Sequence, residues 1–492
     1  MNIREILQKL QFGNPVAEYD RGLQGYFLVT DAFRNLTKDE VDIIAGDKGT
    51  GKTAIYQHLK GSYKTTPELN GVEVITGFNP TGEPLFRRLG DEEKLTEGQY
   101  ITVWKLYFLS LAGNWLIKNS RGENSPALRR LSYLLSKADM VTVDDSAGTV
   151  FSRLMSWLRH NANPKALGID FTFNEFGYPV LTPKVELGES KKEEKQDIEI
   201  ISHQDALNTL NDALAERNVS MWIVIDRLDE AFVGRPDIEA LALRALIRTF
   251  MDFMAFSHIR LKLFVRKDLF RKITRDGFVN LTHVNARKKE IVWDDEDLLV
   301  MLIQRIRSNS ELLRSLGLNR SNDKQLFNAI FPLKVYQHSQ SPTTWHWLLN
   351  QIKDGNGVKA PRNLIDLCVM GQEEQLRLER RNIRDFVFGA PIISADALQK
   401  ACVRLSNQRL EDTLMAEYGE HVKVSIKAFQ NGKAEHTEKS LAELFGVEVA
   451  AARLIASVLC DVGFLGQFGE IYKVPVLYRA GLNISRGKAY KQ

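Results

Sequence analysis

The run GDKGTGKT at residues 46–53 has residue types and a spacing that indicate chemistry, because it fills the phosphate-binding pattern GxxxxGK[ST]. Glycines let the backbone curl so that N–H groups point at a phosphate, and a helix expected from Lys52 adds the positive end of its dipole. The Lys52 ammonium suits the β- and γ-phosphates, and the Thr53 hydroxyl suits Mg²⁺. The alternative is a chance match in a surface loop. We expect the nucleotide to be held by Gly46, Asp47, Lys48, Gly49, Thr50, Gly51, Lys52 and Thr53.

The acidic end of MWIVIDRLDE, residues 221–230, is the second chemical signal. Asp226 ends an apolar run and suits Mg²⁺, held through water, because hard cations select carboxylate and phosphate oxygens. Asp229 or Glu230 would polarise the attacking water, and we favour Glu230. In the common form of this motif the catalytic acid directly follows the metal-binding Asp, whereas Arg227 stands there in this chain. The alternative for Asp226 is a helix N-cap that follows a strand.

Two arginines are candidates for contact with the γ-phosphate. Arg266 ends the apolar run LKLFVR, and the carboxyl ends of parallel strands face the ligand crevice. An ion pair with Asp268 is the alternative for Arg266. Arg362 opens the helix that APRNLI predicts, where it would reach the nucleotide or form a structural ion pair. Weaker candidates for an intersubunit finger, better explained by a solvated helix face, are Arg305 and Arg307.

A sheet and its flanking helices must position these residues. Short runs rich in Val and Ile predict strands buried on both faces, and the helical periodicity between them indicates a parallel α/β sheet. The strands are expected at 41–46, 72–78, 221–226 and 261–266, and the helices at 52–60, 205–216 and 238–256. The gap from about 90 to 200 exceeds one crossover and predicts an insertion. It would hold helices near 100–116, 126–137 and 150–160, a hairpin in FTFNEFGYPVLTPKVEL, and a solvated loop at 186–197.

The order of elements predicts three domains. Residues 1–294 would form the P-loop core with its insertion, and 295–390 a helical lid domain. Residues 391–492 show a long helix at 395–418, then helix, turn, helix and β-wing, which is typical of a winged helix. The predicted fold class is therefore α/β, with a parallel-sheet P-loop core followed by a helical lid and a winged-helix-like C-terminal domain.

Composition limits the function classes. Hydrophobic residues make up 44% and charged residues 26% of the 492, and the net charge is only +4, which argues against binding nucleic acid by bulk charge. The three cysteines are far apart, so neither a disulfide framework nor a structural zinc site is indicated. No run reaches the roughly 18 apolar residues of a membrane span, and the N-terminus lacks a signal-peptide pattern. We expect a cytoplasmic protein that does not bind membranes.

The chain resembles a family of bacterial stand-alone P-loop ATPases related to the STAND and AAA+ ATPases. The segments that carry this resemblance are FGNPVAEYD, YFLVTDAF, IIAGDKGTGKTAIYQHL, VIDRLDEAF, KLFVRKDLF, IVWDDEDLLVMLIQRI, APRNLIDL and KVPVLYRAGLNISRGKAY. It implies an ASCE-type core, a helical lid and a winged helix, ATP and Mg²⁺ as cofactors, and a setting among mobile-element and phage-defence genes. By position, the family's phosphate loop falls on 46–53, its metal-binding acid on Asp226, its acidic pair on Asp229 and Glu230, and its two arginines on Arg266 and Arg362.

Two functions fit an ATP site that no second catalytic motif accompanies. The first is an ATP-hydrolysing switch or sensor with slow or regulated turnover, in which ATP clamps the lid and winged helix to control a separate effector protein in a defence system. The second is a DNA-associated ATPase of the initiator or transposition-regulator type. Its winged helix would enter a groove of the duplex, aided by Lys473, Arg479, Arg486, Lys488 and Lys491. A degenerate, nucleotide-stabilised scaffold is a third reading, and a homo-oligomer is compatible with the first two.

Overall fold

The computed structural model describes residues 1–78, 95–120, 125–138, 140–141, 150, 168–173, 179–184, 203–228, 236–275, 277–416 and 418–490. Contacts divide the chain into two compact units. The sheet unit comprises Thr30–Gly46 and Ile55–Glu290. The helical unit comprises Met1–Val29, Asp47–Ala54 and Ile291–Gln492. Each unit is described by itself below.

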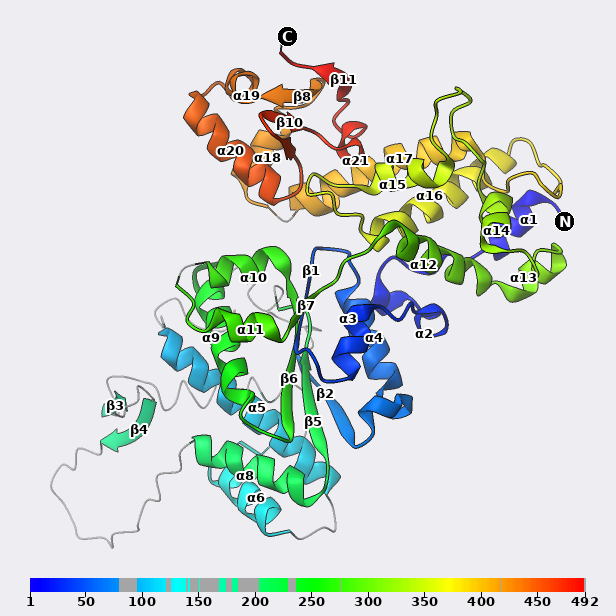
Figure 1. Ribbon diagram of the computed structural model, residues 1–492. Helices are drawn as coiled ribbons and strands as arrows, with labels where there is room; N and C mark the ends of the chain where they lie inside the picture. The colour runs from blue at the N-terminus through cyan, green and yellow to red at the C-terminus, as the bar shows by residue number, and fades with distance from the viewer. Residues whose placement is uncertain are drawn as a thin grey trace, which may run out of the picture. The chain divides into compact units, whose positions relative to one another are not determined.

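The sheet unit is built on a five-stranded sheet in the order β2-β5-β6-β1-β7 (Figure 1). Every neighbouring pair in this sheet is parallel, which confirms the predicted parallel α/β core. Strands β1 and β5 are apolar and almost wholly buried, because helices cover both faces of a parallel sheet. The strands are β1 (Ile43–Gly46), β2 (Val72–Phe78), β5 (Ser220–Ile225), β6 (Ile259–Arg266) and β7 (Lys288–Glu290).

Helices cover this sheet on both sides (Figure 1). On one side α5 and α9 contact each other and strands β2, β5 and β6, and the Trp104 indole of α5 donates to the Ala242 carbonyl of α9 at 2.8 Å. On the other side α3 and α4 meet, and the Tyr56 ring of α4 packs edge-on against Phe264 of β6. The helices are α3 (Asp31–Thr37), α4 (Lys52–Ser62), α5 (Glu97–Asn119), α6 (Pro126–Lys137), α8 (His203–Glu216), α9 (Pro236–Phe253), α10 (Lys267–Thr274) and α11 (Leu281–Ala286).

The predicted insertion is partly described. Its first two helices are confirmed as α5 and α6, and the predicted hairpin is confirmed by the antiparallel pairing of β3 (Gly168–Phe173) with β4 (Pro179–Lys184). Beyond its first residue, Val150, the third predicted helix at 150–160 lies outside the described residues, as does the predicted loop at 186–197.

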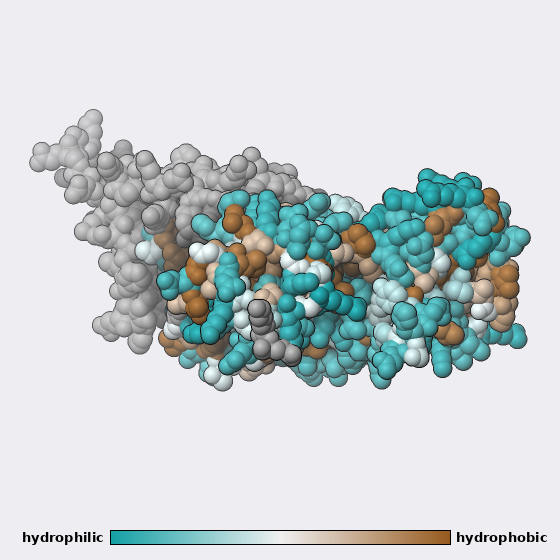
Figure 2. Space-filling model, turned by 90° about the horizontal axis from the view of Figure 1, so that it is seen from above, coloured by the Kyte–Doolittle hydropathy of each residue, from teal (hydrophilic) through white to brown (hydrophobic). Residues whose placement is uncertain are grey.

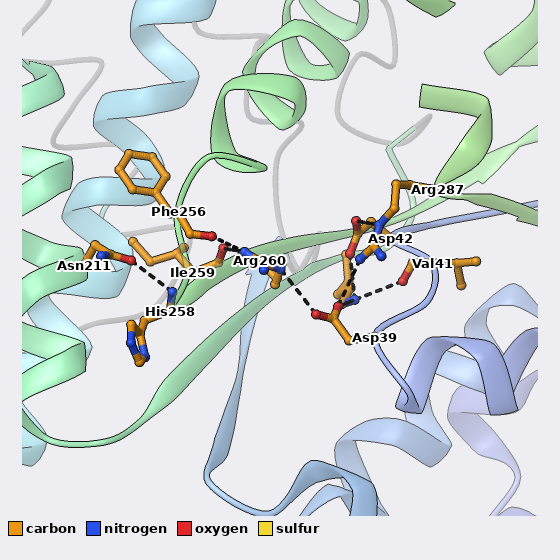
Figure 3. Close-up of polar contacts among 10 residues, drawn as sticks. Asp39, Val41, Asp42, Asn211, Phe256, His258, Ile259, Arg260 and Arg287 are labelled. Carbon is orange, nitrogen blue, oxygen red and sulfur yellow. Dashed lines mark hydrogen bonds and ion pairs between the residues drawn. The ribbon is translucent and has the colours of Figure 1, made fainter. Parts of the chain in front are cut away.

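A partly buried cluster of charged residues lies at the amino-terminal end of β1 (Figure 3). Lys262 of β6 has no exposed surface, and its ammonium donates to Asp39 at 2.5 Å and to Asp42 at 2.7 Å. Arg287 donates to Asp42 from Nε at 2.7 Å, and Arg260 pairs with Asp39. Burial alone would raise the pKa of Asp39, but the positive charges around it, Lys262 first, lower it. Because Asp42 directly precedes β1, this cluster stabilises the strand end opposite the phosphate-binding motif.

The helical unit contains the predicted lid helices together with the N-terminal segment of the chain. The apolar side chains of α1 belong to the same buried cluster as those of α12, α14, α15 and α16, so residues before the sheet pack with residues after it. The elements are α1 (Ile3–Lys9), α2 (Leu23–Tyr26), α12 (Asp295–Arg307), α13 (Ser310–Ser315), α14 (Asp323–Ile330), α15 (Thr344–Ile352) and α16 (Pro361–Glu379). The proposed domain boundaries at 294 and 390 stay predictions.

Arg305 ties the N-terminal segment to the lid helices. Its side chain is 6% exposed, pairs with Asp20 at 3.0 Å and donates to the Phe12 carbonyl at 2.8 Å. The guanidinium also lies over the Tyr26 ring. The solvated helix face expected for Arg305 is therefore wrong, because the polar N-terminal segment covers it, and the arginine has a structural role. Arg307 is partly exposed and pairs with Asp323 at 2.6 Å.

The C-terminal part of the helical unit is a winged helix, as predicted. Strand β8 and helices α19 and α20 precede a wing made of antiparallel β9 and β10, and β11 adds to β8. The long helix expected at 395–418 is α-helical to Arg409 and continues as a π-helical turn, Leu410–Met415. The elements are α17 (Ala395–Arg409), α18 (Glu420–Lys427), β8 (Lys433–Thr437), α19 (Glu438–Phe445), α20 (Val449–Asp461), β9 (Gly466–Phe468), β10 (Ile471–Lys473), α21 (Val476–Arg479) and β11 (Ser485–Lys488).

Figure 2 shows how polar and apolar side chains are distributed over one face of the described residues. On the face seen in Figure 2, hydrophilic side chains predominate and hydrophobic ones form small separate patches. Among the described residues, no helix combines the length and the apolar character needed to cross a membrane.

Candidate nucleotide-binding site

The phosphate-binding motif follows β1 without a break. Gly46 is the last residue of β1, and α4 begins at Lys52, so residues 47–51 form the turn between a buried strand and a helix. Gly49 has φ +78° and Gly51 has φ +100°, conformations in which a side chain would be strained. The motif therefore has the strand, turn and helix context that distinguishes a P-loop from a chance match.

Side chains of the P-loop fold back on its own backbone. The Lys52 ammonium donates to the Asp47 carbonyl at 2.9 Å, and the Thr50 hydroxyl donates to the same carbonyl at 2.7 Å. Thr50 is buried, whereas Lys52 and Thr53 are partly exposed. A flexible ammonium on a partly exposed side chain can exchange a carbonyl for phosphate oxygens, and the contact of Lys52 with phosphates stays a prediction.

Helix α16 of the lid begins on the P-loop. The backbone N–H of Arg362 donates to the Gly49 carbonyl at 3.3 Å. A Cβ at Gly49 would lie 3.1 Å from Cβ of Arg362 and 3.5 Å from Cβ of Ala360, so a side chain there would require a small shift of α16 in addition to a strained φ of +78°. The structure thus brings Arg362, predicted from sequence as the lid arginine, into contact with the phosphate-binding motif.

Trp293 is a second residue that supports the P-loop, and the sequence analysis missed it. Its indole N–H donates to the Thr50 carbonyl at 2.8 Å, and its ring lies 3.9 Å from the Cβ position of Gly51. The sequence feature that could have indicated this role is the position of Trp293 in IVWDDEDLL, directly before the first lid helix, where the chain passes from the sheet to the lid.

Asp226 directly follows β5 and is 5% exposed. Arg227 and Leu228 after it are not helical, so the N-cap alternative for Asp226 is wrong. Arg227 has φ +57°, a left-handed conformation that costs a non-glycine residue about 1 kcal/mol or more and turns the chain sharply at the strand end. The acidic pair Asp229 and Glu230 lies outside the described residues.

Arg266 emerges at the carboxyl end of β6, paired in register with Gly46 of β1. Its guanidinium makes a bidentate ion pair with Asp268, from Nε to Oδ1 at 3.1 Å and from Nη2 to Oδ2 at 2.7 Å. Burial opposes ionisation of Asp268, but the arginine holds the pKa of that carboxyl below its usual range. The ion pair considered from the sequence is therefore present, beside the strand from which the P-loop starts.

Among the described residues, no group of three or more His, Cys, Asp or Glu side chains is placed to hold an ion. Thr53 and Asp226 stay predictions as Mg²⁺ ligands, since hydroxyl and carboxylate oxygens are of the type that Mg²⁺ takes beside phosphate oxygens and water.

The basic residues of the winged helix are in part engaged within the protein. Lys473 pairs with Glu435 at 3.1 Å, and Arg479 donates to the Val474 carbonyl at 2.8 Å. Arg486 and Lys488 are exposed on β11, and Lys491 lies outside the described residues.

The exposed side of α20, the second helix of the helix-turn-helix, is mainly apolar. Leu454 is 71% exposed and Val458 is 46% exposed. The charged residues of this helix are Arg453 and Asp461, and Arg453 pairs with Glu438 at 2.7 Å. The polar groups that this helix could offer toward bases and phosphates are Arg453, which is 65% exposed although paired, and the exposed Ser457.

No protein-family model matches the chain, and no curated protein sequence does so. The chain is similar to the solved structure of the ORC2 protein of Aeropyrum pernix in its ADPNP and ADP complexes, with a TM-score of 0.42 and 12% identity, covering 94% of this chain and 97% of that one. It is also similar to the ORC1 protein of Aeropyrum pernix in complex with DNA, with a TM-score of 0.35 and 13% identity, covering 94% and 95%. A Walker-type ATPase of Pyrococcus abyssi gives a TM-score of 0.39 and 10% identity, covering 93% and 96%.

Proposed function

We propose that this protein binds ATP with Mg²⁺ at the P-loop and hydrolyses it. The observation that carries the proposal is the P-loop itself, with two left-handed glycines between a buried parallel strand and the first turn of α4. Backbone N–H groups and a helix N-terminus in this arrangement favour phosphate, and Lys52 adds a mobile positive charge.

The roles of the individual residues follow from their chemistry. Lys52 would contact the β- and γ-phosphates, and Thr53 and Asp226 would hold Mg²⁺, which when bound neutralises charge on the phosphate oxygens. Glu230 or Asp229 would accept a proton from the water that attacks the γ-phosphorus, as the bond to the β–γ bridging oxygen breaks and ADP leaves. Arg266 and Arg362 would contact the γ-phosphate, and for Arg266 this requires the pair with Asp268 to open or to be shared.

The biological role that we propose is a nucleotide-operated switch that acts on a protein partner. The support is the contact between lid helix α16 and the P-loop. Because of this contact, a change in the P-loop backbone on nucleotide binding would act directly on the lid. The apolar exposed side of α20 favours a protein over duplex DNA as the partner of the winged helix. The effector in a defence system that the resemblance implies stays a prediction. A duplex shift that weakens steeply with salt would instead favour the DNA-associated function.

Turnover of variants at the acidic pair tests the chemistry. Glu230→Gln should keep Mg²⁺–ATP binding and slow the rate of phosphate release by about 100-fold or more, because the amide keeps the shape of the side chain and removes the base. Asp229→Asn is the matched control and should change turnover little. Loss in Asp229→Asn alone moves the base to that residue, and absence of ATP-dependent phosphate release in the wild-type protein contradicts the proposed hydrolysis.

A further inference from the structure

The segment 353–359, which we call the connecting loop, makes up all but one residue of the connection between α15 and α16 and is held by its own hydrogen bonds. Lys353 and Lys359 form an antiparallel bridge that closes the loop at its base. Asp354 closes it at the tip, since one carboxylate oxygen accepts the N–H groups of Asn356 and Val358, each at 2.9 Å. A loop held by its own hydrogen bonds can transmit a displacement from one end to the other.

One end of the connecting loop leads directly onto the P-loop. Ala360 and Arg362 follow it in sequence and are the residues that approach Gly49. Asp354 is also electrostatically linked to the P-loop, because the negative charge of Asp47 acts on its carboxylate. Within the helical unit, the loop therefore carries the residues that support the phosphate-binding backbone.

The tip of the connecting loop packs on the winged helix, backbone against backbone. The Gly355 N–H donates to the Gly463 carbonyl at 2.7 Å, in the turn between α20 and the wing. A Cβ at Gly355 would lie 2.2 Å from the Leu465 carbonyl oxygen, and one at Gly466 would lie 2.8 Å from the Gly355 oxygen. No flexible side chain separates the two segments here, so neither can shift without moving the other.

We propose that the connecting loop couples the P-loop to the winged helix, with Asp354 and Gly355 as the positioning residues that hold the phosphate-binding backbone and the α20–wing turn in one arrangement. This inference rests on the proposed function for its physiological meaning. A partner that binds the winged helix then changes nucleotide affinity, and a nucleotide changes partner affinity by the same factor.

The electrostatics of Asp354 agree with this coupling. Burial is the main cause that raises the pKa of Asp354 to about 6, the N–H groups of Val358 and Asn356 oppose the rise, and the charge of Asp47 contributes to it. From the winged-helix side, Tyr478 of α21 faces the same carboxylate and is itself buried. The folded pKa lies above the usual value for Asp, so this group favours the native loop at low pH and loses that contribution as pH rises through about 6.

Hydrogen exchange of the nucleotide-free protein tests the coupling without relying on ATP. Gly355→Ala should speed exchange of the P-loop peptide, residues 46–54, by about tenfold or more, because the added methyl displaces the loop from the winged helix. Gly419→Ala is the matched control in the helical unit: Gly419 has φ −63° and no atom within 4 Å of its Cβ position, so an added methyl group there meets neither backbone strain nor crowding. It should leave exchange in the P-loop peptide unchanged. Faster exchange confined to the wing, with the P-loop as in wild type, overturns the inference.

Asp354→Asn is the milder second variant, because the amide oxygen can still accept both N–H bonds. In wild type, protection of the P-loop peptide, corrected for intrinsic rates, should fall between about pH 4 and pH 6, from the ordinary pKa of Asp to the raised pKa of Asp354, and the variant should lack this step. The same step in both proteins contradicts the role of Asp354. A non-hydrolysable ATP analogue distinguishes failure of the proposed function from failure of the coupling. If the analogue does not bind to the wild-type protein, the proposed function is wrong. The coupling is decided by the comparison of nucleotide-free proteins in either case.

Discussion

Gly49 is where the P-loop and α16 approach most closely, and Gly49→Ala tests whether that approach is needed to bind nucleotide. A non-glycine residue at φ +78° costs about 1–2 kcal/mol. The new Cβ would also lie 3.1 Å from Cβ of Arg362, tighter than an ordinary contact, and crowding of this kind costs about 1–3 kcal/mol. The sum is about 2–5 kcal/mol, which the loop can avoid only by leaving its present conformation.

Binding of a phosphate must restore that conformation, so the smallest cost of about 2 kcal/mol corresponds to about 30-fold weaker binding. Gly389→Ala is the matched control, because Gly389 has φ +87° with no atom within 4 Å of its Cβ position. Titration calorimetry with Mg²⁺–ATP should show the loss in Gly49→Ala alone, while urea unfolding should show a cost of about 1–2 kcal/mol for the control. Wild-type affinity in Gly49→Ala would refute the reasoning.

Three further variants test other parts of the structure. Trp293→Phe should lower the free energy of unfolding by about 0.5–1.5 kcal/mol in urea, because it removes the N–H bond to the P-loop, and should weaken ATP binding in calorimetry. An unchanged free energy of unfolding and an unchanged ATP affinity would contradict the supporting role of Trp293. Lys262→Met should destabilise the sheet unit by about 3 kcal/mol in urea, and adding Asp42→Asn should recover part of the loss, whereas strictly additive losses contradict a coupled buried pair. Asp268→Asn should raise the affinity ratio of an ATP analogue over ADP by releasing Arg266, and an unchanged ratio in competition binding argues against γ-phosphate sensing.

Elements whose conformation depends on one short stretch of sequence could be predicted from that sequence. The strands β1, β2, β5 and β6 were predicted from apolar runs, and the P-loop is a local motif between a strand and a helix. Strands β1, β5 and β6 are mostly buried as expected, whereas β2 is only partly buried because it lies at the edge of the sheet. Strand β7 was missed because KKE is polar, and an edge strand that pairs with one neighbour needs no apolar run. Arg305 was misread because the residues that bury it lie near the N-terminus, far away in the sequence.

The candidate site shows the same limit. The contact of Arg362 with Gly49 agrees with a prediction made from a helix start, whereas the bond from Trp293 to Thr50 depends on how the lid meets the loop. The glycine contacts at Gly355 also could not be predicted, because a glycine's need for close approach depends on backbone from another segment, here Gly463–Gly466. No periodicity or motif carries that information.

The central claim, that residues 46–53 bind the phosphates of a nucleotide, is tested most directly by calorimetric titration of Lys52→Ala with Mg²⁺–ATP. Lys48→Ala is the matched control, because the motif uses that residue through its backbone and Lys52 through its ammonium. Loss of charge-assisted contacts to two phosphates, at about 1.5–3 kcal/mol each, predicts binding weakened by about 100-fold or more in Lys52→Ala. The control should stay within about threefold of wild type. Equal affinity in Lys52→Ala and wild type would contradict the account.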